Sequence, residues 1–155
     1  MHHILVCDGS RAYYNNSQGV KVNNLIPYKP HLYYKLYRAL QDEGIPEKDM
    51  VFEDEITMVS DIGFFTIRII ENIAQVVHFL VWPEKRVWHN SIRLYRDIKN
   101  ILIDLGFVSF IAASPVGHKS WPQLFCICGG KKSVKLYAEK DNIQYYVINF
   151  GRHIQ

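Results

Sequence analysis

The side chains best suited to chemistry lie at a strand-to-helix junction in the middle of the chain. Arg86 follows Pro83, which ends an apolar run, and it precedes an amphipathic segment whose first residues include His89, Asn90 and Ser91. A helix N-terminus offers unpaired backbone N–H groups and the positive end of the helix dipole, so this junction could bind a phosphate. Two structural alternatives are also consistent with the sequence: Arg86 as a solvated surface charge, and Asn90 and Ser91 as helix caps.

A second candidate for chemistry is His78, which stands in the apolar run before Pro83. The ordinary pKa of an imidazole suits a general base that removes a proton from a reacting group. A histidine inside an apolar strand is also often a packed side chain with a structural hydrogen bond. The sequence is compatible with both roles.

The cysteine content argues against a disulfide framework and against a metal centre. The chain has three cysteines, Cys7, Cys126 and Cys128. An odd and sparse set is typical of a reducing compartment and of free, packed thiols. The Cys126–Cys128 pair lacks the second pair of ligands that a zinc site needs. We therefore expect no metal and a cytoplasmic location, which for a viral protein means the host cytoplasm or the virion.

The length and composition are those of one globular domain over residues 1–155. Of the 155 residues 48% are hydrophobic and 21% are charged, which excludes a coiled coil, a disordered tail and a multidomain enzyme. The 18 basic and 15 acidic residues give a net charge of +3, too small to indicate a nucleic-acid-binding protein by itself. No apolar run approaches the roughly 18 residues of a membrane span, and the first residues lack a signal-peptide pattern. We expect no membrane association.

Aromatic residues make up 14% of the chain and include tyrosine pairs at 13–14, 33–34 and 145–146. With Lys131, Lys132 and Lys135 they could stack on nucleic acid and neutralise its phosphates. Tyrosines also gather at protein interfaces, and lysines on edge strands prevent aggregation. A protein partner is therefore favoured over nucleic acid.

Hydrophobic periodicity predicts a helix followed by a three-strand meander in the first half of the chain. His3 to Cys7 is expected to form a short strand, and the Gly-, Asn- and Ser-rich stretch from Asp8 to Pro27 a long loop or irregular hairpin that could act as a lid or contact arm. A helix is expected from Pro30 to Gly44. Three strand-like runs follow, at Ile56 to Ser60, Phe64 to Ile70 and Gln75 to Trp82.

The second half begins with a long amphipathic helix from Trp88 to Leu105. Phe107 to Ser114 is apolar on both faces, which suggests a central strand. A short helix from Ser120 to Cys128 precedes a hairpin, Val134 to Ala138 and Ile143 to Phe150, about a turn at Asp141-Asn142. The predicted fold class is α+β, with a central mixed, mostly antiparallel sheet flanked by helices.

Two stretches resemble motifs of the GNAT family of acyl-coenzyme A-dependent N-acyltransferases. Val81-Trp82-Pro83-Glu84-Lys85-Arg86-Val87-Trp88-His89-Asn90-Ser91 is similar to the family's Val-x-Pro and the Arg/Gln-x-x-Gly-x-Gly/Ala loop after it. The family's second motif, Asn, Ala, Leu-Tyr and Gly-Phe, is similar in spacing to His118, Trp121, Leu124-Phe125 and Gly129-Gly130. The resemblance covers roughly residues 55–150, the core of the domain, and residues 1–50 match only weakly.

This resemblance implies a GNAT-like fold and acyl transfer from an acyl-coenzyme A, such as acetyl-CoA, to an amine. In the family, the strand before the loop splays from its neighbour, and its backbone holds the pantetheine arm of the coenzyme. Here that strand contains Leu80, Val81 and Trp82.

The resemblance also assigns roles to the junction described first. The loop and the helix start face the coenzyme A pyrophosphate, which implicates Arg86, His89, Asn90 and Ser91. His78 lies in the strand where family members often keep a catalytic base.

A narrower similarity leads to a second hypothesis. Gly117-His118-Lys119-Ser120, Phe125 and Gly130 are similar to a segment of the virion-associated protein of short-tailed bacteriophages, which has a GNAT-like domain. In the enzymes a tyrosine that acts as general acid often occupies the position of Phe125, which has no hydroxyl. The alternative is therefore a non-catalytic bacteriophage virion or host-interaction protein that retains the fold. A small nucleic-acid-binding module is the third hypothesis.

Overall fold

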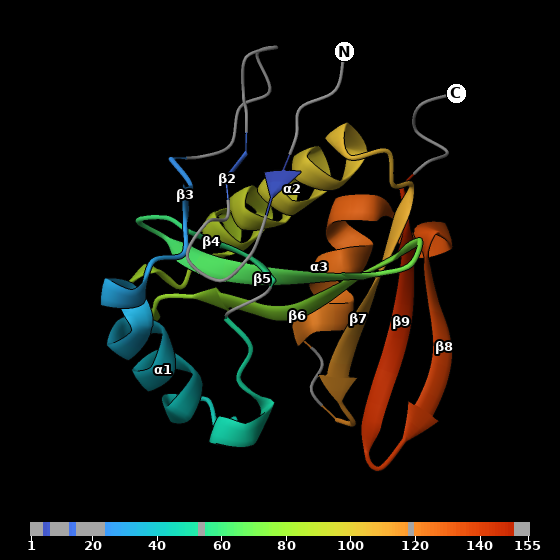
Figure 1. Cartoon of the computed structure of the whole chain (residues 1–155). Coiled ribbons are helices and arrows are strands. Elements are labelled where there is room, and N and C mark those ends of the chain that lie inside the picture. The colour runs from blue at the N-terminus through green and yellow to red at the C-terminus, as the bar shows by residue number, and fades with distance from the viewer. Residues whose placement is uncertain (1–4, 7–12, 15–23, 53–54, 118–119, 151–155) are drawn as a thin grey trace.

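A mixed β-sheet forms the centre of the molecule. The computed structural model describes residues 5–6, 13–14, 24–52, 55–117 and 120–150. Within them, seven strands lie in the order β3-β4-β5-β6-β7-β9-β8 (Figure 1). Every neighbouring pair is antiparallel except β6 and β7, which are parallel. A separate small sheet pairs β1 with β2. The predicted α+β class with a mostly antiparallel sheet is confirmed.

The bounds of the elements confirm each helix and strand predicted after Pro30, with small shifts at the ends. The strands are Leu5–Val6 (β1), Tyr13–Tyr14 (β2), Ile26–Pro27 (β3), Ile56–Val59 (β4), Gly63–Ile70 (β5), Ile73–Val81 (β6), Ser109–Pro115 (β7), Val134–Lys140 (β8) and Ile143–Asn149 (β9). The α-helices are Tyr33–Asp42 (α1), Trp88–Asp104 (α2) and Ser120–Gly129 (α3). Short 3₁₀ turns are at Pro30–Leu32, Glu47–Asp49, Pro83–Lys85 and Lys131–Ser133.

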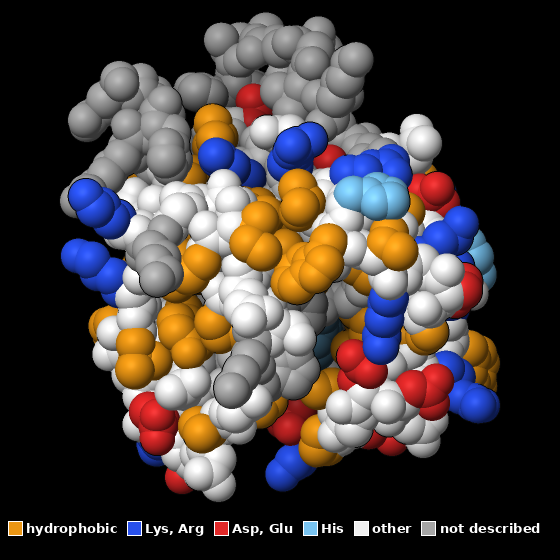
Figure 2. Space-filling model, turned by 180° about the vertical axis from the view of Figure 1, so that it is seen from behind, with side chains coloured by type: hydrophobic (Ala, Val, Ile, Leu, Met, Phe, Trp, Pro, Cys, Tyr) orange, Lys and Arg blue, Asp and Glu red, His pale blue; other side chains and the backbone are white. Residues whose placement is uncertain are grey.

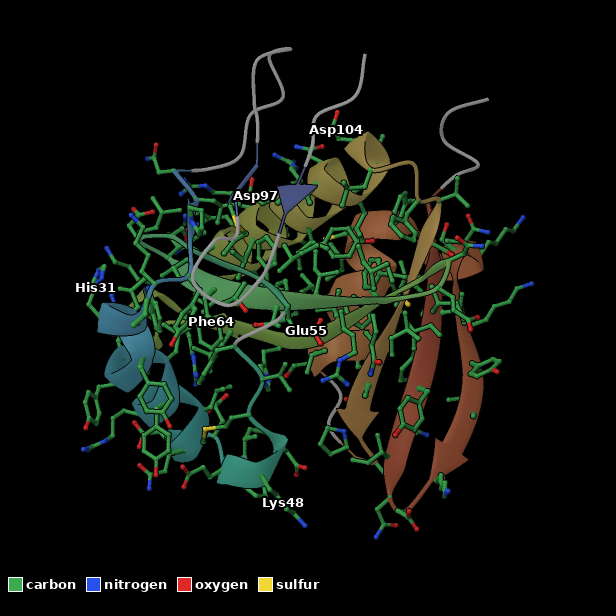
Figure 3. The ribbon with its side chains drawn as sticks, in the orientation of Figure 1. His31, Lys48, Glu55, Phe64, Asp97 and Asp104 are labelled. Carbon is green, nitrogen blue, oxygen red and sulfur yellow. The ribbon has the colours of Figure 1, made fainter. Side chains whose placement is uncertain are left out.

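The helices cover both faces of the sheet. Successive side chains of a strand point to opposite faces, and β5 shows this: Phe64 packs in the cluster that contains Leu36 of α1, whereas Phe65 packs in the one that contains Leu94 of α2. Figure 1 shows α1 and α2 on opposite sides of β5 and β6, and Figure 3 labels Phe64 on the α1 side and Asp97 on α2. The molecule therefore has three layers, with the sheet between helices.

The predicted turn of the last hairpin is confirmed. Asp141 and Asn142 join β8 to β9, and both have positive φ values, 54° and 64°. Two consecutive positive φ values are characteristic of a type I′ turn, whose twist matches that of the flanking strands. Asp and Asn tolerate this conformation well. The predicted central strand is also confirmed, because β7 lies between β6 and β9.

The stretch from Asp8 to Pro27, predicted as a long loop or irregular hairpin, contains two short strands. Tyr13–Tyr14 pairs with Leu5–Val6, and Ile26–Pro27 pairs with β4 at the edge of the main sheet. Two-residue strands are too short for an alternating pattern to reveal them. Pro27 counts against a strand, but proline is accepted at a sheet edge because no neighbour needs its missing N–H. The predicted lid or contact arm falls mostly outside the described residues.

None of the helices in the described part of the chain is both long enough and apolar enough to cross a membrane.

Candidate functional site

The sheet forks between β6 and β7. Over the residues that the structure describes, these two strands pair only at Gln75 with Ile111 and at Val76 with Ala112, although both strands continue beyond these pairs. Figure 1 shows β6 and β7 diverging after this short contact. The predicted splay of the strand before the junction is therefore present.

A β-bulge in β6 lies at the point of divergence. On the other side of β6, Val76 pairs with Ile67 and His78 pairs with Thr66, so that Val77 faces no residue of β5 in the described register. A bulge bends its strand and increases the local twist. The bulge therefore gives a physical reason for β6 to turn away from β7.

The fork opens a groove that consists of two adjoining cavities. Figure 2 shows that face of the molecule hollowed near its centre, with hydrophobic, acidic and basic side chains around the hollow. The first cavity, called here the α2 chamber, has a volume of about 330 Å³. It lies between the end of β6 and the first turns of α2 and α3, and its lining includes Val81, Arg86, Trp88, Ser91 and Leu124.

The second cavity, called here the β7 chamber, lies in the fork itself. Its volume is about 170 Å³, and its lining includes Leu40, Ile45, His78, Ala112 and Phe125. Three residues line both chambers, Glu43, Phe79 and Leu80. Ligands bound in the two chambers would therefore lie next to each other.

Arg86 is held at the rim of the groove. Its Nε donates a hydrogen bond to the backbone oxygen of Val81 at 3.1 Å, and its Nη2 lies 3.2 Å from Oε1 of Glu43. Both side chains of this ion pair are more than two-fifths exposed. Exposed ion pairs contribute about 0 to 1 kcal/mol, so Arg86 can leave Glu43 for an anionic ligand at small cost.

The predicted pyrophosphate residues at the start of α2 have different environments. Ser91 lines the α2 chamber, whereas His89 is exposed and is not part of the lining. Asn90 is buried, and its Nδ2 donates to the backbone oxygen of Lys85 at 2.7 Å. The capping alternative for Asn90 and Ser91 is wrong, because the N-cap residue is Val87 and no side chain caps this helix.

The residues of the predicted pantetheine strand also have different environments. Leu80 and Val81 line the groove. Trp82 lies on the α1 side of the sheet, where its Nε1 donates to the backbone oxygen of Ser60 at 3.1 Å and its ring lies 5.5 Å from that of Phe64. Trp82 is only 3% exposed and is outside the groove.

His78 lies in the β7 chamber with one nitrogen engaged. Its Nε2 accepts a hydrogen bond from the backbone N–H of Val51 at 2.9 Å, which places the proton of the neutral ring on Nδ1. Burial, together with the nearby positive charge of Arg68, lowers the pKa of His78 to about 4. The ring is neutral at physiological pH, and its Nε2 lone pair is occupied. A role as catalytic base stays a prediction.

Glu43 is a charged groove residue that the sequence did not indicate. It directly follows α1, and only the packing of α1 against the sheet brings it to the end of β6. No spacing along the chain relates Glu43 to Arg86, so no local signal could have predicted the pair.

The remaining predictions concern the cysteines, metal binding and the tyrosine pairs. Cys126 and Cys128 are free and half-buried, and burial raises the pKa of the Cys128 thiol to about 11. Among the described residues, no group of three or more His, Cys, Asp or Glu side chains could hold a metal ion. Tyr34 is 77% exposed, whereas Tyr145 and Tyr146 are half-buried on β9.

No family model, curated protein or solved structure matches this chain.

Proposed function

We propose that this protein has a GNAT-like fold and binds an acyl-coenzyme A in the groove between β6 and β7. The observation that carries the proposal is the fork in the sheet. β6, the strand before the loop that resembles the GNAT motif, separates from its parallel neighbour β7 at a bulge. This geometry is the one that the family uses to admit the pantetheine arm. The groove also adjoins Arg86 and the first turn of α2, where an anionic group is favoured.

The backbone of β6 can hold the pantetheine amides. The N–H of Trp82 donates to the oxygen of Ile62 on the β5 side at 2.9 Å, whereas the oxygen of Val81 is bonded by Arg86 on the opposite side. Because backbone groups alternate along a strand, those of Val81 are directed toward the groove. An extended arm with amide groups is expected to lie along this edge, with the pyrophosphate near Arg86 and Ser91.

If the protein is active, the proposed reaction is transfer of the acyl group to an amine. The amine nitrogen attacks the thioester carbonyl carbon, a C–N bond forms and the C–S bond breaks. The amine loses one proton to solvent and the departing sulfur takes one up, so that the products are an amide and free coenzyme A. This route through solvent requires no release of the His78 Nε2 from Val51.

The proposal predicts that acetyl-CoA binds to the full chain with sub-millimolar affinity in isothermal titration. Replacing Arg86 with alanine should weaken acetyl-CoA binding about tenfold, because a charge-assisted hydrogen bond to phosphate is lost. The same variant should bind S-acetylpantetheine, which has no nucleotide or pyrophosphate, as the wild type does. Arg38→Ala, an exposed arginine on α1 that does not line the groove, is the charge-matched control. Absence of binding at millimolar acetyl-CoA would refute the proposed function.

A non-catalytic role, as in a bacteriophage virion or host-interaction protein, is favoured by Phe125. Its ring is 4% exposed and packs against Tyr95 and Phe110 with centroids 6.2 and 6.0 Å apart. It offers no proton to a leaving thiolate, although it lines the β7 chamber. Release of free thiol from acetyl-CoA, measured with a panel of amines, distinguishes the two roles. Binding without thiol release would support the non-catalytic protein.

A further inference from the structure

The β7 chamber has one charged group in its wall. Among the described residues that line it, Glu43 alone carries a charge at neutral pH, because the imidazole of His78 stays neutral in its buried position. The rest of the wall is largely aliphatic and aromatic, with Leu40, Ile45 and Phe125 among its members. Such a surface favours a ligand with one apolar group and one positive charge.

The volume of the β7 chamber limits the size of the apolar group. A cavity of about 150 Å³ lined by apolar side chains is known to hold a benzene molecule. The β7 chamber measures about 170 Å³. It therefore fits a single aromatic ring or a branched aliphatic group of similar size.

The carboxylate of Glu43 is available to a cationic ligand with or without a donor, because its ion pair with Arg86 is exposed and weak. It lies 3.2 Å from Arg86, and both side chains of the pair are more than two-fifths exposed. An anionic donor in the α2 chamber would draw Arg86 toward its phosphates. Glu43, which lines both chambers, can then pair with another cation at the boundary between them.

We infer that the β7 chamber is the acceptor site and that the acceptor is a primary amine with one compact apolar group and no carboxylate. The inference rests on the proposed function, which supplies the acyl donor. The ammonium lies against Glu43, and the apolar group fills the space between Leu40, Ala112 and Phe125. A carboxylate on the acceptor would oppose Glu43 and meet no cation in the chamber wall.

The test measures the binding of three small molecules to the full chain by isothermal titration, without any acyl donor. 2-Phenylethylamine is the proposed type of ligand, 2-phenylethanol lacks its charge, and phenylalanine adds a carboxylate. The amine should bind about three- to fivefold more tightly than either of the other two, as expected for a charge pair with a half-exposed carboxylate. Equal binding of the amine and the alcohol would overturn the inference.

Two variants locate the amine in the chamber. Glu43→Gln should reduce the affinity for 2-phenylethylamine to that for 2-phenylethanol, and Glu47→Gln, an exposed carboxylate outside the lining, should change neither. Ala113→Leu adds volume at an exposed position of β7 that lines the chamber, so it should abolish binding without disturbing the core. If Glu43→Gln binds the amine as the wild type does, the amine does not lie at Glu43 and the inference fails.

The same samples separate this inference from the proposed function. If acetyl-CoA binds and 2-phenylethylamine does not, the acceptor assignment alone fails. If the amine binds through Glu43 and acetyl-CoA does not, the proposed function fails and the amine site stands. If hexanoyl-CoA binds more tightly than acetyl-CoA and Ala113→Leu removes this gain, the chamber holds the acyl chain and the inference is overturned.

Discussion

Replacing Gly63 with alanine is expected to lower the free energy of unfolding by about 3 kcal/mol. A Cβ atom at this position would overlap the backbone oxygen of Leu80 and lie 2.9 Å from the Cα of Val81. Both neighbours belong to β6, whose backbone is held by pairing with β5, so the strands must separate to admit the methyl group. The cost exceeds the modest gain that alanine brings by reducing the flexibility of the unfolded chain. Urea denaturation followed by circular dichroism measures it.

Gly129→Ala is the matched control for this prediction. Gly129 lies at the end of α3, and a Cβ there would make an ordinary contact, 3.5 Å from the hydroxyl of Tyr95. Alanine also has the higher helix propensity, so this variant should be as stable as the wild type or slightly more stable. Because Leu80 and Val81 form the groove wall, Gly63→Ala should also weaken acetyl-CoA binding. Equal stability of the two variants would show that β5 and β6 are not held as closely as described.

Acidification from pH 7 to pH 4.5 is expected to remove about 2 kcal/mol of stability through His78 alone. The folded chain keeps His78 neutral, since burial and the positive charge of Arg68 lower its pKa from 6.5 to about 4. The unfolded chain binds a proton at this residue below its ordinary pKa. Between about pH 4 and pH 6.5, unfolding is therefore accompanied by the binding of a proton to His78. The contribution of His78 is complete above about pH 6.5 and is lost as the pH falls toward 4.

His78→Gln isolates this contribution. The amide oxygen of glutamine can accept the hydrogen bond from the N–H of Val51 but does not titrate, so the pH dependence of the variant should be shallower by about 2 kcal/mol. The variant His31→Gln, which changes an exposed histidine, is the matched control. Urea denaturation at a series of pH values gives both curves. If stability falls with pH equally in the wild type and in His78→Gln, then His78 has the same pKa in the folded and unfolded states.

Most of the secondary structure was predictable because its signals are local. The apolar stripe of α2 recurs at helical spacing, and its residues Tyr95, Ile98 and Ile101 are buried against the sheet. The turn at Asp141 and Asn142 depends on the backbone conformations that these two residue types accept. Such preferences act within a few neighbouring residues, so they can be recognised in the sequence before the chain is folded.

The candidate site was predictable only in part. The sequence correctly indicated that Leu80, Val81, Arg86 and Ser91 lie around one place, because they are close together in the chain. It failed to place Trp82, whose ring packs on the α1 side of the sheet with its Nε1 bonded to the backbone oxygen of Ser60, outside the groove. It also missed that Asn90 bonds to the backbone oxygen of Lys85.

By itself, the sequence determined the helices, the main strands, the α+β class and the position of the cationic junction at Arg86. These depend on periodicity and on turn preferences, which neighbouring residues carry. Only the tertiary structure decided where the sheet forks, that Glu43 reaches Arg86, and that the Nε2 of His78 is taken by the N–H of Val51. Each of these depends on segments far apart in the chain. Their mutual positions follow from how the helices and strands pack together, which no local pattern encodes.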